Sequence, residues 1–340
     1  MRAAVVHGAD DLRVDERPEP TPGPGEVLIA VEWGGICGSD LAYWRHGTSG
    51  TAVLAHPMVL GHEFAGRVSA LGAGVTDVEV GTPVTVHPAT PVGDPLPERL
   101  AGRTNLFAQV RYSGSAAFDP HTDGGFSQRV VVRAEQLRRV PEGVSTQHAS
   151  LAEPFAVALH AVSRLGDVTG REVLVNGCGP IGSLVVAALR WRGAGRITGA
   201  DLQQSSLAVA RALGADDLRD LSAGDQLPTD AELVVEASGA PAALGAVLRA
   251  TARGGRIVQV GNLPGAPSPA ALGDLVTREI TWVGSYRFVD EIDEALTAMA
   301  GGVDLSPVIT HTFPLADAVQ AFGVAADRTS GSSKVLLDLR

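Results

Sequence analysis

Short apolar runs separated by turn residues make up the first half of the chain. Residues 26–31 form one such run after the Pro- and Gly-rich segment 21–25, and residues 64–68 form another just before a glycine-rich turn. Apolar runs of this length between turns are typical of strands. We therefore predict a β-rich domain over residues 1–153.

The strand pattern weakens between Pro88 and Asp123. Four prolines crowd the first part of this stretch, and small residues fill positions 113–117. So long a stretch without a clear pattern predicts an extended, exposed loop.

A different pattern begins after Glu153, where Ala-rich segments with helical spacing alternate with short apolar runs. The apolar runs lie at residues 172–176, 196–200, 232–236, 256–260 and 280–284. Strands that alternate with helices indicate a parallel, doubly wound sheet, which is the architecture of a Rossmann domain. We predict this domain over residues 154–288.

The final segment, residues 289–340, contains a helical stretch followed by apolar runs at 308–314 and 334–339. Because the chain ends on a strand, we expect this segment to return to the first domain and complete it. The predicted fold class is therefore α/β, with a β-rich domain and a Rossmann domain.

Length and composition agree with two folded domains and limit the partners. A chain of 340 residues with 45% hydrophobic and 19% charged residues can build more than one packed core. Lys and Arg number 27 and Asp and Glu 38, so the formal charge is 27 − 38 = −11, and no basic run suggests nucleic-acid binding. No apolar run approaches the roughly 18 residues of a membrane helix, and the first residues lack a signal-like segment. We expect a cytoplasmic protein with no membrane partner.

The first predicted Rossmann strand runs directly into a glycine-rich turn. Gly177, Gly179 and Gly182 match the G-x-G-x-x-G spacing of a dinucleotide-binding turn. The first glycine permits a tight turn, the second lets backbone N–H groups approach a pyrophosphate, and the third lets helix and strand pack closely. We predict that these glycines bind the cofactor together with Pro180 and Ile181.

The next strand ends at Asp201, 24 residues after Gly177. Its carboxylate can accept hydrogen bonds from the adenosine ribose, and it would repel a 2′-phosphate. Residues 202–204 offer no cation to offset that repulsion, so the sequence favours NAD over NADP. Cys178 is interpreted as a small filler of the turn rather than a nucleophile. The alternative for the whole motif is a glycine turn that binds no nucleotide.

Candidate metal ligands lie in the first domain. Cys37 and Cys178 are the only cysteines, too few for a disulfide framework, and Cys37 and the pair His62 and Glu63 lie in glycine-flanked loops. Thiolate, imidazole and carboxylate are zinc ligands, and three protein ligands leave a fourth position open for an alcohol or water. A buried cysteine and a hydrogen-bonded histidine are the alternative. Glu153 at the domain junction is a further candidate.

At these residues the chain resembles the zinc-dependent medium-chain dehydrogenase/reductase family, and above all its polyol branch, which includes sorbitol dehydrogenase and L-idonate 5-dehydrogenase. The resemblance runs along essentially the whole chain. It is carried by the segments G-I-C-G-S-D (35–40), G-H-E (61–63), D-G-G-F (123–126), E-P (153–154), the glycine turn and G-S-Y-R-F (284–288). It implies a GroES-like catalytic domain, a Rossmann domain and a homodimer or homotetramer.

The resemblance also implies roles for the candidate ligands. It assigns Cys37, His62 and Glu63 to one catalytic zinc, and it has Glu153 either bind that zinc directly or hold the zinc-bound water. Relatives often carry a second, structural zinc on four cysteines, in a lobe that here falls near residues 91–107. Because no cysteine occurs between residues 38 and 177, we expect no structural zinc.

Tyr43 and Arg287 match family positions that face the substrate. A surface pairing of Arg287 with Asp290 or Glu291 is the alternative for that residue.

Relatives often have a relay histidine five residues after the zinc cysteine, where this chain has Ala42, so the proton must leave by another route.

The implied reaction is the reversible oxidation of a secondary alcohol of a sugar acid or polyol to a ketone, with hydride transfer to NAD. Ser39 is expected to take the alcohol proton first, while His46 is interpreted as a surface histidine. Within the same enzyme class, sorbitol or xylitol, butanediol and threonine are alternative substrates. A non-catalytic dinucleotide-binding protein is the alternative from another class.

Overall fold

The computed structural model describes residues 1–340 and divides them into two compact units. The first unit comprises residues 1–153 and 309–340, and the second comprises residues 154–308. The segment 289–308, which we expected in the first domain, thus lies in the second unit. Its helix α8 (Glu291–Ala300) is bound there by polar contacts, because Glu291 accepts a hydrogen bond from His160 at 2.7 Å and Glu294 pairs with Arg192.

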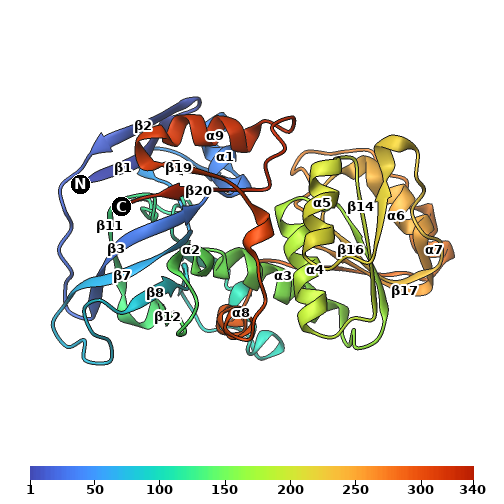
Figure 1. Cartoon of the computed structure of the whole chain (residues 1–340), viewed down its shortest axis with the longest axis horizontal. Coiled ribbons are helices and arrows are strands. Elements are labelled where there is room, and N and C mark those ends of the chain that lie inside the picture. The colour runs from blue at the N-terminus through green and yellow to red at the C-terminus, as the bar shows by residue number, and fades with distance from the viewer. The chain divides into compact units, whose positions relative to one another are not determined.

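The first unit is built on a seven-stranded sheet in the order β12-β8-β7-β3-β20-β19, with β11 also paired to β3. The last strand of the chain returns to this unit, as the sequence predicted, and lies antiparallel beside β3 (Figure 1). The strands are β3 (Glu26–Gly35), β7 (Glu63–Leu71), β8 (Pro83–Val86), β11 (Arg129–Arg133), β12 (Leu137–Arg139), β19 (Ile309–Pro314) and β20 (Lys334–Asp338).

Smaller elements surround this sheet. A second sheet has the order β2-β1-β6, and β4 pairs with β5. The remaining elements of this part are β1 (Arg2–Gly8), β2 (Asp11–Glu16), β4 (Thr48–Ser49), β5 (Ala52–Val53), β6 (Met58–Val59), α1 (Gly38–His46), η3 (Ala134–Gln136), α2 (Thr146–Ala149), η7 (Leu315–Asp317) and α9 (Ala318–Ala326).

In the core of the first unit, an aromatic side chain of the C-terminal segment packs against aromatic side chains of the N-terminal segment. Phe322 on α9 makes edge-to-face contacts with Trp44 and Phe126, at ring-centroid distances of 5.7 and 6.2 Å. Rings of this size each bury on the order of 150–250 Å², so the contacts bind the C-terminal segment by apolar packing as well as by strand pairing.

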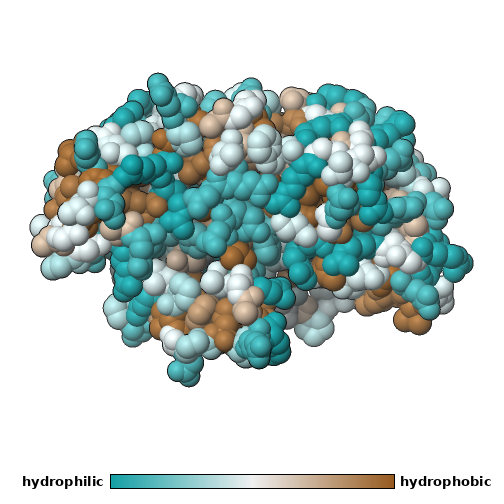
Figure 2. Space-filling view, turned by 90° about the horizontal axis from the view of Figure 1, so that it is seen from below, coloured by the Kyte–Doolittle hydropathy of each residue, from teal (hydrophilic) through white to brown (hydrophobic).

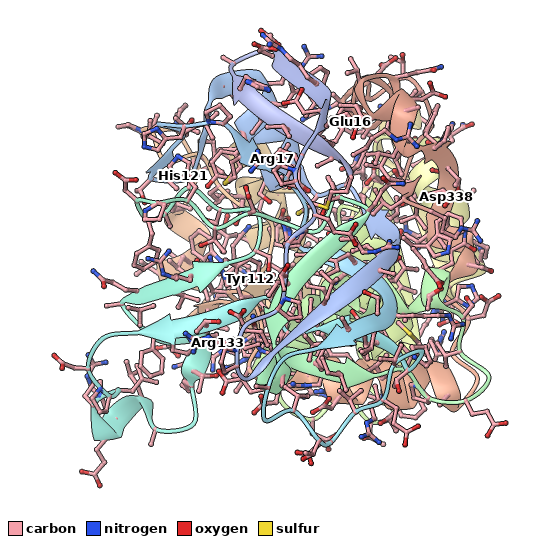
Figure 3. The ribbon with its side chains drawn as sticks, turned by 90° about the vertical axis from the view of Figure 1, so that its left-hand side faces the viewer. Glu16, Arg17, Tyr112, His121, Arg133 and Asp338 are labelled. Carbon is pink, nitrogen blue, oxygen red and sulfur yellow. The ribbon has the colours of Figure 1, made fainter.

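The stretch from Pro88 to Asp123 is more ordered than we predicted. It contains the antiparallel ribbon of β9 (Ala89–Val92) and β10 (Gln109–Tyr112), with two short 3₁₀ helices, η1 (Glu98–Leu100) and η2 (Thr104–Leu106), between them. The prediction of an exposed loop is wrong for β10, because Val110 and Tyr112 alternate on one buried face. Figure 3 shows Tyr112 at the end of this ribbon, where it meets the main sheet.

The second unit contains a parallel six-stranded sheet in the order β15-β14-β13-β16-β17-β18. Helices cover both faces, with α4 and α5 on one side and α6 and α7 on the other (Figure 1). The strands are β13 (Glu172–Asn176), β14 (Arg196–Asp201), β15 (Asp217–Asp220), β16 (Ala231–Glu236), β17 (Thr251–Gln259) and β18 (Thr281–Gly284). The helices are α3 (Ala152–Leu165), which starts in the first unit, α4 (Pro180–Trp191), α5 (Gln204–Ala212), η4 (Leu221–Ala223), η5 (Pro241–Ala243), α6 (Leu244–Ala250), α7 (Gly273–Thr277) and η6 (Ser306–Val308).

All five predicted strands of this sheet are present, and one was missed. The missed strand, β15, has the sequence Asp-Leu-Arg-Asp and lies at the sheet edge, where polar residues are tolerated, so it lacks an apolar run.

None of the helices has the length and the apolar run needed to cross a bilayer. Figure 2 shows polar side chains spread over the visible face, with small apolar patches between them.

Candidate functional site

Three candidate metal ligands meet where β3 ends and β7 begins. The antiparallel register places Gly35 opposite Glu63, so the turn that carries Cys37 lies against the pair His62 and Glu63. The thiol sulfur, an imidazole nitrogen and a carboxylate oxygen of these residues lie within 4.8 Å of one another. His62 and Glu63 are buried and Cys37 is partly exposed, so the cluster has one side open to a ligand.

Glycines make room for this cluster. A Cβ atom on Gly35 would lie 2.4 Å from the Glu63 carboxylate, and one on Gly61 would lie 2.3 Å from the Phe126 ring. Gly61 also has a φ of +98°, a conformation that side-chain-bearing residues rarely adopt. Both glycines therefore let the ends of β3 and β7 and the neighbouring loop approach closely enough to bring the three ligand groups together.

Asp40 connects the two loops, a role that the sequence analysis missed. Its buried carboxylate accepts hydrogen bonds from the backbone N–H groups of Cys37 at 2.9 Å and Gly61 at 3.1 Å. It also lies 3.8 Å from Nδ1 of His62. Burial raises the pKa of the Asp40 carboxyl. The sequence did contain a signal for this role. Asp40 lies three residues after Cys37, which is the acidic N3 position of a capping box at the start of α1.

Lys334 is a second residue that the sequence analysis missed. Its ammonium group donates to both carboxylate oxygens of Glu63, at 2.7 and 2.8 Å, and to the carbonyl oxygen of Ile36 at 3.2 Å. Burial alone would lower the pKa of Lys334, but the anionic groups of Glu63 and Cys37 outweigh that effect and raise it. The side chain therefore carries a full positive charge beside the candidate ligands.

Glu153 lies outside the three-ligand cluster. Its carboxylate accepts a 2.5 Å hydrogen bond from the Tyr112 hydroxyl, and the ring of Tyr112 packs edge-on against His62 with 5.5 Å between centroids. Burial raises the pKa of the Glu153 carboxyl. Tyr112 was also missed, because it falls in the stretch that we predicted as an exposed loop.

The imidazole of His62 is buried beside two acidic side chains of the site, Cys37 and Asp40. Burial would lower the pKa of its imidazole, but the neighbouring Cys37 and Asp40 outweigh burial and raise it well above 6.5. Without a metal, the protonated imidazole is therefore favoured over the neutral one. A divalent metal ion would take the place of that proton, since metal ligation requires the neutral imidazole.

The other residues that we singled out in the first unit all lie on α1, which directly follows Cys37, but they differ in exposure. Tyr43 is buried, and its hydroxyl accepts a hydrogen bond from the backbone N–H of Ala116 at 2.9 Å. Ser39 lies in the first turn of α1 and is partly exposed, and His46 at the end of α1 is exposed, as expected for a surface histidine.

The glycine turn of the second unit has the backbone geometry that its sequence predicted. Gly177 has a φ of +88°, and a Cβ atom on Gly182 would lie 1.8 Å from the Gly177 carbonyl oxygen. Gly179 precedes Pro180 and Ile181 at the start of α4, and a Cβ atom on Gly179 would meet nothing within 4 Å. The turn therefore has open space at the helix N-terminus, where an anionic group is favoured.

Asp201 ends β14 beside this turn. Its carboxylate accepts hydrogen bonds from the backbone N–H groups of Cys178 at 2.6 Å and Gln203 at 2.8 Å. Burial, together with Asp201, raises the pKa of the Cys178 thiol to about 12. Such a thiol is not ionised near neutral pH, which agrees with its interpretation as a filler of the turn.

Glu236 supports the turn from the neighbouring strand and was not singled out from the sequence. It lies opposite Asn176 in the parallel register and accepts a 2.6 Å hydrogen bond from the Asn176 amide. It also accepts the backbone N–H of Ser238 at 2.8 Å. Because a Cβ atom on Gly177 would lie 2.5 Å from Ser238, Glu236 holds the segment against which the glycine turn packs.

Arg287 follows β18 in the second unit. Its guanidinium lies over the ring of Tyr286, 4.9 Å from the ring centroid, and its φ of +52° is unusual for a residue with a side chain. Glu291, one of the two acids considered as its partner, is hydrogen-bonded to His160.

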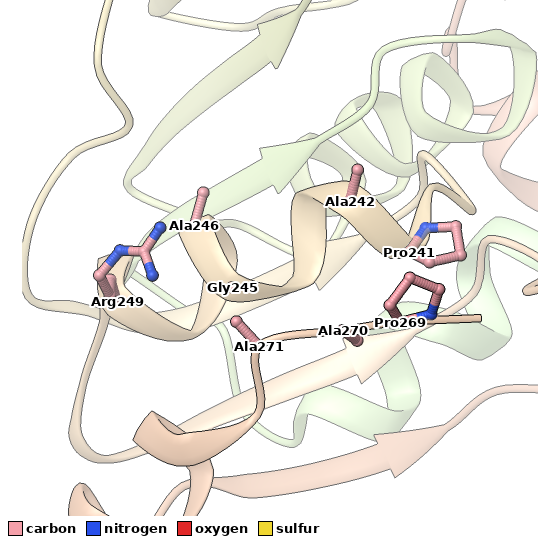
Figure 4. Close-up of a pocket in the computed structure, with 8 residues that line it drawn as sticks. All are labelled: Pro241, Ala242, Gly245, Ala246, Arg249, Pro269, Ala270 and Ala271. Atoms are coloured by element: carbon pink, nitrogen blue, oxygen red, sulfur yellow. The ribbon is translucent and has the colours of Figure 1, made fainter.

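A hollow of about 400 Å³ opens elsewhere in the second unit (Figure 4). It is lined by Pro241, Ala242, Gly245, Ala246, Arg249, Pro269, Ala270 and Ala271. Arg249 is its only ionisable residue, so the hollow contains neither an acid nor a nucleophile, and we assign it no chemistry.

Two family models match the chain. The model described as "Alcohol dehydrogenase GroES-like domain" matches residues 23–142, and the model described as "Zinc-binding dehydrogenase" matches residues 180–301. The first match contains all three ligands of the cluster, and the second begins within the glycine turn.

Full-length relatives give the same result. Sorbitol dehydrogenase of Gallus gallus is 35% identical over 94% of this chain and 92% of its own length. L-idonate 5-dehydrogenase (NAD(P)(+)) of Escherichia coli K12 is 33% identical over 99% of this chain and 98% of its own. The crystal structure of L-idonate 5-dehydrogenase from that organism covers 99% of this chain and 97% of its own, with a TM-score of 0.90.

A solved alcohol dehydrogenase of Escherichia coli CFT073, complexed with NADH, is 28% identical, covers 99% of both chains and has a TM-score of 0.87. These relatives therefore match nearly the whole length of this chain. The chain belongs to the zinc-dependent medium-chain dehydrogenase family, in the branch of sorbitol dehydrogenase and L-idonate 5-dehydrogenase, and it is an alcohol dehydrogenase.

Proposed function

We propose that this enzyme reversibly oxidises a secondary alcohol of a sugar acid or polyol to a ketone with NAD, and that its substrate is L-idonate, which gives 5-keto-D-gluconate. The observation that carries the proposal is the cluster of Cys37, His62 and Glu63, whose ligand atoms lie within 4.8 Å of one another. The substrate class comes from the similarity to sorbitol dehydrogenase and L-idonate 5-dehydrogenase.

Cys37, His62 and Glu63 would hold one catalytic zinc ion. Their donor set fits zinc, because a thiolate, an imidazole and a carboxylate are its usual protein ligands and three of them leave a position open. Bound zinc supplies the Lewis acidity that lets an alcohol lose its proton near neutral pH. We assign Glu153 to holding a water molecule or a substrate hydroxyl, since its carboxylate lies outside the cluster and is bound to Tyr112.

Ser39 would accept the alcohol proton first. It lies two residues after Cys37 in the first turn of α1 and is partly exposed. With Ala42 in place of a relay histidine, the onward acceptor is ordered water, the cofactor ribose or Glu153.

The cofactor would bind at the glycine turn with its adenosine ribose at Asp201. A preference for NAD is supported by the partners of Arg196 and Arg211, two cations that lie within ten residues of Asp201 in the sequence. Arg196 begins β14 whereas Asp201 ends it, and Arg196 is paired with Asp217 at 2.5 Å. Arg211 donates to the backbone carbonyl oxygen of Ala215 at 3.1 Å. Both guanidinium groups therefore have partners other than Asp201, which supports a preference for NAD.

Arg287 and Tyr43 would contact the substrate. A guanidinium can bind a carboxylate through two parallel hydrogen bonds, which would favour a sugar acid over the matching neutral polyol. The Tyr43 hydroxyl accepts the N–H of Ala116 and lies 3.5 Å from the Ser115 hydroxyl, so its own proton can be donated to Ser115 or to a substrate oxygen.

A substrate comparison tests the proposal. We expect the highest kcat/KM for L-idonate with NAD, and for 5-ketogluconate with NADH, in a panel that also contains sorbitol, xylitol, 2,3-butanediol and threonine. Elemental analysis should find one zinc per chain. A preference for small neutral diols would contradict the sugar-acid assignment, and two zinc ions per chain would contradict the single-zinc assignment.

A further inference from the structure

Lys334 is the only lysine of the chain, and its side chain is almost completely buried, with 2% of the residue exposed. It begins β20, and the backbone beside it is fixed to the end of β3, because the N–H of Ile36 donates to the carbonyl oxygen of Val335 at 3.0 Å. Lysine is rarely buried to this extent unless its charge is paired.

All three N–H donors of the ammonium group have acceptors. Two go to the carboxylate oxygens of Glu63 at 2.7 and 2.8 Å, and the third goes to the carbonyl oxygen of Ile36 at 3.2 Å. Glu63 is itself only 1% exposed, so bulk water does not compete for this pair. The contact therefore fixes both the position and the orientation of the carboxylate.

A metal ion bound by Glu63 would share that carboxylate with the ammonium group. Both partners are cations, and the interaction between charges is much stronger in a buried site than in water. Each cation therefore weakens the binding of the other to Glu63. The pair stabilises the carboxylate of the metal-free protein and at the same time opposes metal binding.

We propose that Lys334 is a positioning residue that holds Glu63 from the side of β20 and thereby lowers the affinity of the site for zinc. The proposal rests on the ligand set of Cys37, His62 and Glu63 proposed above. A lysine with a purely structural role would have the opposite signature, because its loss would loosen the site and weaken metal binding.

The Lys334→Met variant tests the sign of this effect. The zinc dissociation constant of the metal-free enzyme is measured by competition with a chromophoric chelator. We expect it to fall by about tenfold or more, since the Glu63 carboxylate is then no longer shared with a buried positive charge. Lys334→Arg keeps the charge and is the matched control, with an expected change of less than about threefold. Unchanged or weaker zinc binding in Lys334→Met would overturn the proposal.

A double-mutant cycle with Glu63→Gln tests whether Lys334 acts through Glu63. Glu63→Gln alone is expected to weaken zinc binding, and adding Lys334→Met to it should change nothing further. If Lys334→Met tightens binding equally in both backgrounds, the effect bypasses Glu63 and the positioning role is wrong. If Glu63→Gln leaves the zinc affinity unchanged, the proposed ligand set is wrong instead.

A measurement on the unmodified enzyme covers the case in which the variants do not fold. Because the chain has one lysine, enzyme labelled with ¹³Cε-lysine gives a single side-chain NMR signal. Adding one equivalent of zinc to the metal-free protein should shift that signal, because the charge on its Glu63 partner becomes shared. A signal that does not move would overturn the proposal.

Discussion

The candidate metal site and the glycine turn are built in opposite ways. The metal site takes its groups from five separate parts of the chain: the turn after β3, the start of β7, β10, the start of α3 and β20. Its charged groups are buried, and partners from distant segments hold them, as Lys334 holds Glu63 and Tyr112 holds Glu153. The glycine turn takes most of its groups from residues 176–182, and its contacts are largely made by backbone atoms.

This difference separates two ways of making a binding site. In the metal site Lys334 holds Glu63 and Tyr112 holds Glu153, so a change at one residue spreads to its partner. In the glycine turn the geometry follows from backbone conformation, so single glycines decide whether the turn can form. The predictions below test whether the two sites respond to substitution in these different ways.

The largest effect is expected for Cys37→Ser. Replacing the thiolate with a hydroxyl removes the softest of the three proposed zinc ligands, and we expect kcat/KM to fall at least about a hundredfold with loss of bound zinc. Because Cys37 and the glycine turn belong to different units, NADH binding, measured by fluorescence titration, should remain within about twofold. Full activity with zinc retained would remove Cys37 from the ligand set.

The next effect concerns Gly182→Ala in the glycine turn. Its Cβ atom would lie 1.8 Å from the Gly177 carbonyl oxygen, so the turn must shift. We expect the dissociation constant for NADH to rise by about tenfold or more and the free energy of unfolding to fall by about 1–3 kcal/mol. Gly179→Ala is the matched control, since its Cβ atom meets nothing within 4 Å and its φ of −60° suits any residue. Equal losses of stability in the two variants would contradict this account.

The pH dependence of the zinc-free protein follows from His62. The pKa of its imidazole is raised above 6.5 in the folded state by Cys37 and Asp40, which outweigh burial, so the folded state binds the proton more tightly than the unfolded state. The resulting stability is complete below pH 6.5 and is lost as the pH rises through the folded pKa, by up to about 1.4 kcal/mol per pH unit. Urea unfolding from pH 6 upward measures this slope. His62→Gln should remove it, and a slope that survives this substitution would assign the titration to another group.

The smallest effect is expected for Tyr112→Phe. The substitution removes one hydrogen bond to the buried Glu153 carboxylate and keeps the ring that packs on His62. One hydrogen bond typically contributes a net of about 0.5–1.5 kcal/mol, so we expect kcat/KM to fall by roughly twofold to tenfold, with zinc retained. Unaltered kinetics would show that the Tyr112 hydroxyl does not position Glu153 for the reaction.

The sequence predicted the second unit well because its structure follows from local pattern. Apolar runs of five residues correspond to β13, β14, β16, β17 and β18, and Gly177 has the positive φ that its place in the motif requires. The polar edge strand β15 was missed for the same reason, since it carries no such run. The helix α8 was placed in the wrong unit because hydrogen bonds and ion pairs from α3 and α4 hold it, and a linear pattern does not show them.

The candidate ligands Cys37, His62 and Glu63 were also identified from the sequence, because each has a chemically distinctive side chain in a glycine-flanked loop. Their partners were not. Asp40, Tyr112 and Lys334 have ordinary side chains, and the last two lie 49 and 271 residues from Glu63 along the chain. Nothing local distinguishes Lys334 from a surface lysine at the end of the chain.

What the sequence by itself determined is therefore the class of the elements that carry an apolar run and the identity of the chemically distinctive groups. Backbone propensity, apolar periodicity and short motifs act over a few residues, so they can be read along the chain. Only the tertiary structure decided which buried charges are paired, that Tyr112 binds Glu153 and that Lys334 binds Glu63. The physical reason is that burial and pairing depend on contacts between strands far apart in sequence, which form only when β20 returns to lie beside β3.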